Sequence, residues 1–114
     1  MATTVASRKS KGRSLQNKVA DVLKMAFPQL EEDDVKPILM GGKGEDIVLS
    51  PAARRLIPYS IECKNQEKTS IFAWLKQAEA NTKPNSEPVL IFKRNRSKTY
   101  VVVELDTWVK LIKK

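Results

Sequence analysis

The chain has no histidine and only one cysteine, Cys63. Without histidine, the sequence excludes serine–histidine–aspartate triads, cysteine–histidine nucleophiles and zinc held by imidazole groups. A single cysteine cannot form an internal disulfide or a zinc site built from several thiolates, which is typical of a reducing compartment. Any catalysis must therefore use carboxylates, lysine, hydroxyl groups and metal ions held by oxygen atoms.

Long apolar runs and an apolar block near the first residue are also absent. A membrane span needs roughly 20 apolar residues, and a secretory signal needs an apolar segment close to its start. We therefore expect a soluble, cytoplasmic protein with no membrane partner.

The charge of the chain is strongly one-sided. Its 114 residues contain 21 lysine and arginine residues against 13 acidic ones, a formal net charge of +8, and 41% of the residues are apolar. This combination indicates a folded domain with an anionic partner rather than a disordered basic tail. We expect a flexible basic arm over residues 1–13 and a single domain over residues 14–114.

The apolar spacing predicts an α/β fold. It places helices over residues 14–27 and 71–81 and from Asp106 onward, and strands over residues 35–40, 46–49, 59–64, 88–92 and 99–105. Residues 52–58 read as a turn, and the last two strands are expected to form a hairpin that is buried on both faces. The element order predicts a mixed central β-sheet flanked by helices, with Cys63, Trp74 and Trp108 in the core.

Asp46, Glu62 and Lys64 form the most informative group of polar residues. Asp46 follows a glycine-rich loop, whereas Glu62 and Lys64 share one face of a predicted strand because strand side chains alternate. If the strands over residues 46–49 and 59–64 form a hairpin, both carboxylates face one cavity with the lysine beside them. Such a pair is repulsive when empty, and a hard divalent cation such as Mg²⁺ or Mn²⁺ relieves the repulsion.

The backbone carbonyl of Cys63 and water molecules would complete the coordination of such an ion. Lys64 has two roles that the sequence leaves open. It could help to deprotonate or orient an attacking water, or it could stabilise the pentacovalent phosphate as a cation.

These residues resemble the D...(D/E)xK signature of the PD-(D/E)xK nuclease superfamily, whose restriction-endonuclease-like core has the order αβββαβ. The likeness rests on Asp46 and, after a gap of 15 residues, on Glu62-Cys63-Lys64. It is nearer to archaeal-type Holliday-junction resolvases and similar phage proteins. In those proteins a KG-containing segment leads into the first helix and a glycine-rich loop precedes the aspartate, which Lys11-Gly12 and residues 41–46 match.

The resemblance implies a Mg²⁺- or Mn²⁺-dependent DNA endonuclease that hydrolyses phosphodiester bonds in branched or junction DNA during recombination and repair. It implies Asp46 and Glu62 as metal ligands and Lys64 as a catalytic residue. It also implies a homodimer, since a junction resolvase cuts two strands symmetrically. The alternatives are another nuclease of the superfamily, of the nicking, restriction-like or repair type, and a non-catalytic basic nucleic-acid-binding module.

Two positions depart from the family pattern. The resolvases carry a metal-site glutamate on the first helix, and Gln16 stands at the matching position. A neutral amide can still contact the metal or its water, so Gln16 is kept as a site residue, but it should weaken metal binding. Glu45 replaces the proline before the aspartate and could restore the missing charge.

Lysine and arginine residues cluster near the start of the chain, in the glycine loop, after the second strand and at the expected hairpin. Phosphate contacts need only charge and reach, so these clusters favour binding to the DNA backbone without reading its sequence. The expected DNA contacts are Arg8, Lys9, Lys11, Arg13, Lys43, Arg54, Arg55, Arg94 and Arg96.

Overall fold

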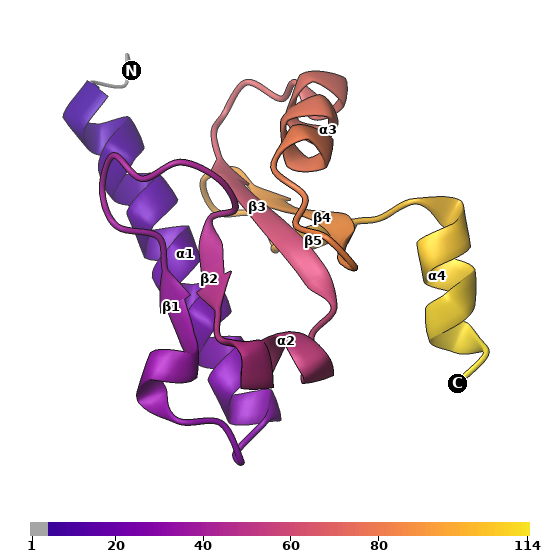
Figure 1. Cartoon of the computed structure of the whole chain (residues 1–114). Helices are drawn as coiled ribbons and strands as arrows, with labels where there is room; N and C mark the ends of the chain where they lie inside the picture. The colour runs from indigo at the N-terminus through magenta and orange to yellow at the C-terminus, as the bar shows by residue number, and fades with distance from the viewer. Residues whose placement is uncertain (1–4) are drawn as a thin grey trace.

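Two β-sheets lie between helices in the computed structural model, which describes residues 5–114 (Figure 1). In the first sheet, β1 (Val35–Pro37) and β2 (Ile47–Leu49) are antiparallel. In the second, β3 (Tyr59–Asn65) runs parallel to β4 (Glu87–Lys93), which pairs antiparallel with β5 (Tyr100–Val102). The predicted α/β class with a mixed sheet and flanking helices is confirmed.

The helices are α1 (Val5–Ala26), α2 (Pro51–Leu56), α3 (Ile71–Ala80) and α4 (Leu105–Ile112), with a short 3-10 helix over Glu32–Asp34. Helix α1 packs against β1, β2 and β3, whereas α3 packs against β3 and β4. Apolar residues from α1, both sheets and α2 form the main core, among them Leu15, Val35, Ile47, Ala53 and Ile61. No helix in the described part of the chain is long and apolar enough to cross a membrane.

Helix α1 begins earlier than the sequence predicts, at Val5 instead of Ser14. The basic residues expected in a flexible arm therefore lie in its first turns, while residues 1–4 fall outside the described part of the chain. The Arg13 guanidinium donates to the Ile38 carbonyl at 2.8 Å. Contacts with the rest of the domain can outweigh weak local helix propensity, which explains why the sequence pattern misses this segment.

Residues 51–56 form helix α2 where the sequence predicts a turn. Ser50 caps the helix by accepting a hydrogen bond from the Ala53 N–H at 3.1 Å, and Pro51 occupies its first position. Serine before proline is a recognised helix start, so the signal was present in a segment too short to show apolar periodicity.

The C-terminal elements also differ from the prediction. Strand β5 is shorter than expected, and Tyr100 and Val101 are exposed at the edge of the sheet, so this strand is not buried on both faces. Helix α4 begins at Leu105, with Glu104 in the capping position predicted for Asp106. Trp108 is 52% exposed and does not belong to the core, because α4 projects from the side of the molecule away from α1 (Figure 1).

Arg54 on α2 joins separate parts of the fold. Its guanidinium pairs with the carboxylate of Glu45 and also donates to the Tyr59 carbonyl at 3.2 Å and to the Ser86 hydroxyl at 3.0 Å. Glu45 is buried, and its other carboxylate oxygen has no hydrogen-bond partner within residues 5–114. The sequence predicts Arg54 as a DNA contact, but these bonds already engage its guanidinium inside the protein.

Replacing Arg54 with alanine should destabilise the fold, because it leaves the buried Glu45 carboxylate without its cation. We expect the free energy of unfolding to fall by about 2–4 kcal/mol. This loss is smaller than the largest losses caused by breaking fully buried ion pairs, because the Arg54 side chain is partly exposed. Urea denaturation measures this change. Arg55→Ala, at the exposed neighbouring position, is the matched control and should change it by less than about 0.5 kcal/mol. Equal losses in both variants would contradict this role.

Candidate active site

Asp46 lies where the two sheets meet. Its N–H donates to the Ile61 carbonyl of β3 at 2.9 Å, and its own carbonyl accepts from the Ile38 N–H at 2.8 Å. In a regular strand both groups of one residue point to the same neighbouring strand, so the backbone bends at Asp46. The hairpin considered between residues 46–49 and 59–64 does not form. Strand β2 pairs with β1 instead, and helix α2 lies between β2 and β3 in the chain. The link at Asp46 nevertheless brings its carboxylate beside β3.

The structure brings Asp46, Glu62 and Lys64 together. The Cys63 N–H donates to Asp46 Oδ2 at 2.8 Å, which fixes the aspartate against the middle of β3. The Glu62 carboxyl lies within hydrogen-bonding reach of Asp46, and Lys64 Nζ lies 3.9 Å from Glu62 Oε2. Two carboxyl groups and one ammonium therefore share a small volume at the edge of β3.

Burial of this pair disfavours its negative charge. Glu62 is only 3% exposed, and burial together with the nearby Asp46 charge raises the pKa of Glu62 to about 7, against the opposing effects of Asn81 and Lys64. Burial also raises the pKa of Asp46, although the hydrogen bond from the Cys63 N–H opposes the change. Neutralising two carboxylates in this position requires either a proton or a cation.

The oxygen atoms at the site fit a hard divalent cation. Asp46 and Glu62 supply carboxylates, and the Cys63 carbonyl faces the same edge of β3 as its N–H, which contacts Asp46. Within residues 5–114 no group of three or more acidic, histidine or cysteine side chains could hold a metal ion. Further ligands would therefore be a carbonyl, an amide or water, which Mg²⁺ and Mn²⁺ accept.

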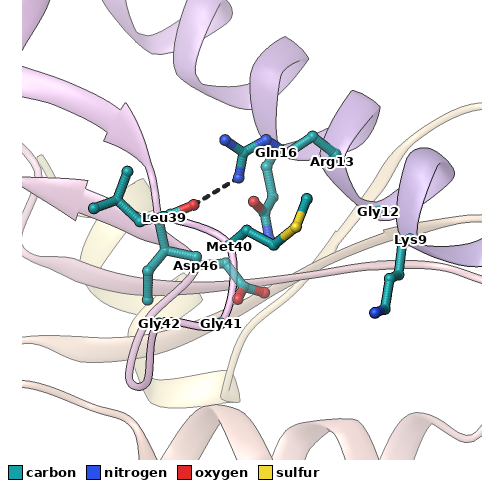
Figure 2. A pocket seen from close by; sticks show the side chains of 10 residues that line it. Lys9, Gly12, Arg13, Gln16, Leu39, Met40, Gly41, Gly42 and Asp46 are labelled. Carbon is teal, nitrogen blue, oxygen red and sulfur yellow. Dashed lines mark hydrogen bonds between the residues drawn. The ribbon is translucent and has the colours of Figure 1, made fainter. Parts of the chain in front are cut away.

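A pocket of about 440 Å³ opens beside this pair, with Asp46 in its lining. Gln16 also lines this pocket, and Figure 2 shows its side chain extending from α1 toward Asp46. Lys9 and Arg13 from the same helix also line it. Glu45, the residue expected to restore the negative charge that Gln16 lacks, pairs with Arg54 instead.

Most of the predicted DNA contacts surround one end of the molecule. Arg8 and Lys11 line a hollow with residues 65–68, where the Asn65 amide donates to the Lys11 carbonyl at 3.3 Å. The turn between β4 and β5 is held against this loop, since the Gln66 N–H donates to the Lys93 carbonyl and the Asn95 N–H donates to Glu67. We call the resulting surface the basic end. Its members are Arg8, Lys9, Lys11, Lys68, Arg94 and Arg96.

The other predicted DNA contacts lie elsewhere. Lys43 is exposed in the glycine loop, between β1 and β2. Arg55 lies on α2, at the end of β2 opposite that loop (Figure 1). The structure therefore separates Arg55 from the basic end.

The sequence pattern missed Asn81, at the C-terminal end of α3. Its side-chain amide donates to Glu62 Oε1 at 3.4 Å. No motif marks an asparagine that reaches back to a strand 19 residues earlier. Gln77, another polar residue of α3, is exposed. Cys63 and Trp74 are buried as predicted.

A mixed α/β fold that places an aspartate beside the glutamate and lysine of one strand defines a nuclease of the PD-(D/E)xK type. The family model described as "Phage putative PDDEXK endonuclease" matches residues 7–114. The chain belongs to this family, because the match covers nearly its whole length. Comparisons with curated proteins and with solved structures found no match.

Metal-free protein should become less stable as the pH rises from 4.5 toward 7. An ordinary glutamate titrates near 4.5, whereas the pKa of Glu62 in the fold is about 7. The folded state therefore binds more protons than the unfolded chain in this range, so its stability falls as the pH rises and levels off once Glu62 also ionises in the fold, near pH 7. We expect the Tm in EDTA to fall with pH over this range, and Glu62→Gln to weaken that dependence.

The difference between wild type and Glu62→Gln isolates this group from other carboxylates that titrate in the same range. Glu79→Gln, on the exposed surface of α3, is the control and should keep the wild-type pH dependence. An unchanged pH dependence in Glu62→Gln would show that Glu62 does not hold the proton.

Proposed function

We propose that this nuclease is a Mg²⁺- or Mn²⁺-dependent DNA endonuclease that hydrolyses phosphodiester bonds at Asp46, Glu62 and Lys64. The observation that carries the proposal is the buried Glu62 carboxyl, within hydrogen-bonding reach of Asp46 and 3.9 Å from the Lys64 ammonium. Two acids and a lysine in this arrangement can hold a cation and a phosphate side by side.

Each side chain has a distinct task in this proposal. Asp46 and Glu62, with the Cys63 carbonyl, would hold the ion, which lowers the pKa of a bound water and offsets charge on the phosphate. Lys64 stands beside Glu62 and can donate to a phosphate oxygen or orient the attacking water. Gln16 contributes its amide from α1, at the position that Figure 2 shows.

Glu62→Ala and Lys64→Ala should each reduce DNA cleavage by about 10³-fold or more, because each removes a group at the reacting phosphate. DNA binding in EDTA should stay within about twofold of wild type, since phosphate affinity depends mainly on the basic end. Gel-based cleavage and fluorescence anisotropy measure the two effects. Glu79→Ala and Lys36→Ala, at exposed positions, are matched controls. Undiminished cleavage by either site variant would overturn the assignment.

Branched DNA is the substrate class that we propose. The basic end spans the start of α1, the loop after β3 and the turn between β4 and β5, so its charges are spread over several elements rather than along one groove-reading helix. A homodimer would present two such surfaces and two sites. Helix α4 is the proposed contact, because it projects from the domain and exposes Leu105, Trp108 and Ile112.

With Mg²⁺, a four-way junction should be cut about tenfold or more faster than matched linear, nicked or forked DNA, with paired cuts in opposite strands. Such a preference arises where the protein fits the shape of the junction better than that of plain duplex. Equal cleavage of linear duplex would favour a nicking, restriction-like or repair nuclease. Tight binding without cleavage of any form, with Mg²⁺ or Mn²⁺, would favour the non-catalytic module.

A further inference from the structure

The glycine loop between β1 and β2 exposes two adjacent apolar side chains at the pocket. Leu39 and Met40 are each 79% exposed, and both line the pocket that also contains Asp46 (Figure 2). Large apolar side chains in water forgo the stabilisation that burial would give them. Two such neighbours beside a catalytic pocket point to a ligand that covers them.

The backbone holds these two side chains in place. The Gly42 N–H donates to the Leu39 carbonyl at 2.8 Å, which closes a four-residue turn. Gly41 has a φ of +80°, the value that a type II turn requires at its third position. The hydrogen bond from Arg13 to the Ile38 carbonyl ties the base of the turn to α1. We call residues 39–42 the apolar turn.

Cations border the apolar turn. Lys9 and Arg13 line the same pocket, and Lys43 is exposed directly after the turn. A ligand that contacts both the exposed apolar side chains and these cations must have an apolar surface and negative charge. DNA offers this combination where a base has left the stack, because the face of the base is apolar and its phosphates are anionic.

We propose that Leu39 and Met40 bind unstacked bases of the DNA substrate, and that the apolar turn therefore favours sites where base pairing is interrupted next to the scissile phosphate. This inference rests on the proposed nuclease function and specifies its substrate. Apolar side chains of this kind insert between or beneath bases and contribute affinity that does not depend on sequence.

The test measures DNA binding in EDTA, so that no cleavage occurs. The probes are a duplex with one unpaired 2-aminopurine and the same duplex with that base paired. Wild-type protein should bind the unpaired probe about tenfold more tightly and change its fluorescence, because an unpaired base leaves the stack at a lower cost than a paired one. Leu39→Ser/Met40→Ser should remove that preference and keep the affinity for the paired duplex, because Lys9 and Arg13 remain.

Two further variants make the comparison specific. Met25→Ser is the matched control, since Met25 is 83% exposed near the end of α1, and it should behave like wild type. Leu39→Met/Met40→Leu retains the apolar surface and should keep the preference. Circular dichroism verifies that every variant is folded.

The outcomes separate this inference from the proposed function. A wild-type protein without preference for the unpaired probe, or a serine variant that keeps it, would overturn the inference. A serine variant that instead changes the sedimentation coefficient of the free protein would show that the turn contacts a second copy. A protein that shows the preference but cleaves no DNA with Mg²⁺ or Mn²⁺ would support base binding by the apolar turn, and would overturn the nuclease proposal together with the link to a scissile phosphate.

Discussion

The close approach of two buried carboxyl groups, Asp46 and Glu62, is the constraint on which the organisation of this domain depends. Two negative charges in a poorly hydrated space are unfavourable, and the raised pKa of Glu62 expresses that cost. The fold nevertheless enforces the approach, through the backbone bond from Asp46 to Ile61 and the bond from Cys63 to Asp46. A cation bound in the proposed way would relieve this cost and so couple the stability of the fold to its chemistry.

Positive charge is arranged around this pair at two distances. Lys64 lies close enough to interact with the Glu62 carboxylate itself. Lys9 and Arg13 line the adjacent pocket, and the basic end continues from there to the turn between β4 and β5. In the proposed mechanism the nearer charge would serve the reacting phosphate, whereas the outer ones would hold the flanking phosphates of the DNA. The long first helix provides much of the outer set, because it begins at Val5 and so includes the basic residues that precede Ser14.

The sequence predicted the elements that have strong periodicity and the residues that share a strand. Glu62 and Lys64 lie two residues apart on β3, so their shared face follows from alternation alone. The position of Asp46 depended on a sheet pairing, and that pairing was predicted incorrectly, since a single backbone bond replaces the hairpin. Asn81 and Arg54 could not be assigned, because their partners are fixed only by tertiary packing. The exposure of Trp108 also depends on tertiary packing. The spacing of apolar residues identifies the apolar face of a helix, but it does not show whether another element covers that face.

The charge of the site depends on the neutral side chain of Gln16 and on the ion pair that Glu45 forms with Arg54. Glu45 pairs with Arg54, so it does not restore the charge that Gln16 lacks relative to the family pattern. With both acids ionised, Asp46, Glu62 and Lys64 sum to −1, and a bound divalent cation would bring that sum to +1. A third carboxylate would have made it zero. Under the proposed mechanism, the site would therefore give up some attraction for the ion and gain attraction for a phosphodiester, which suits the net positive charge of the chain.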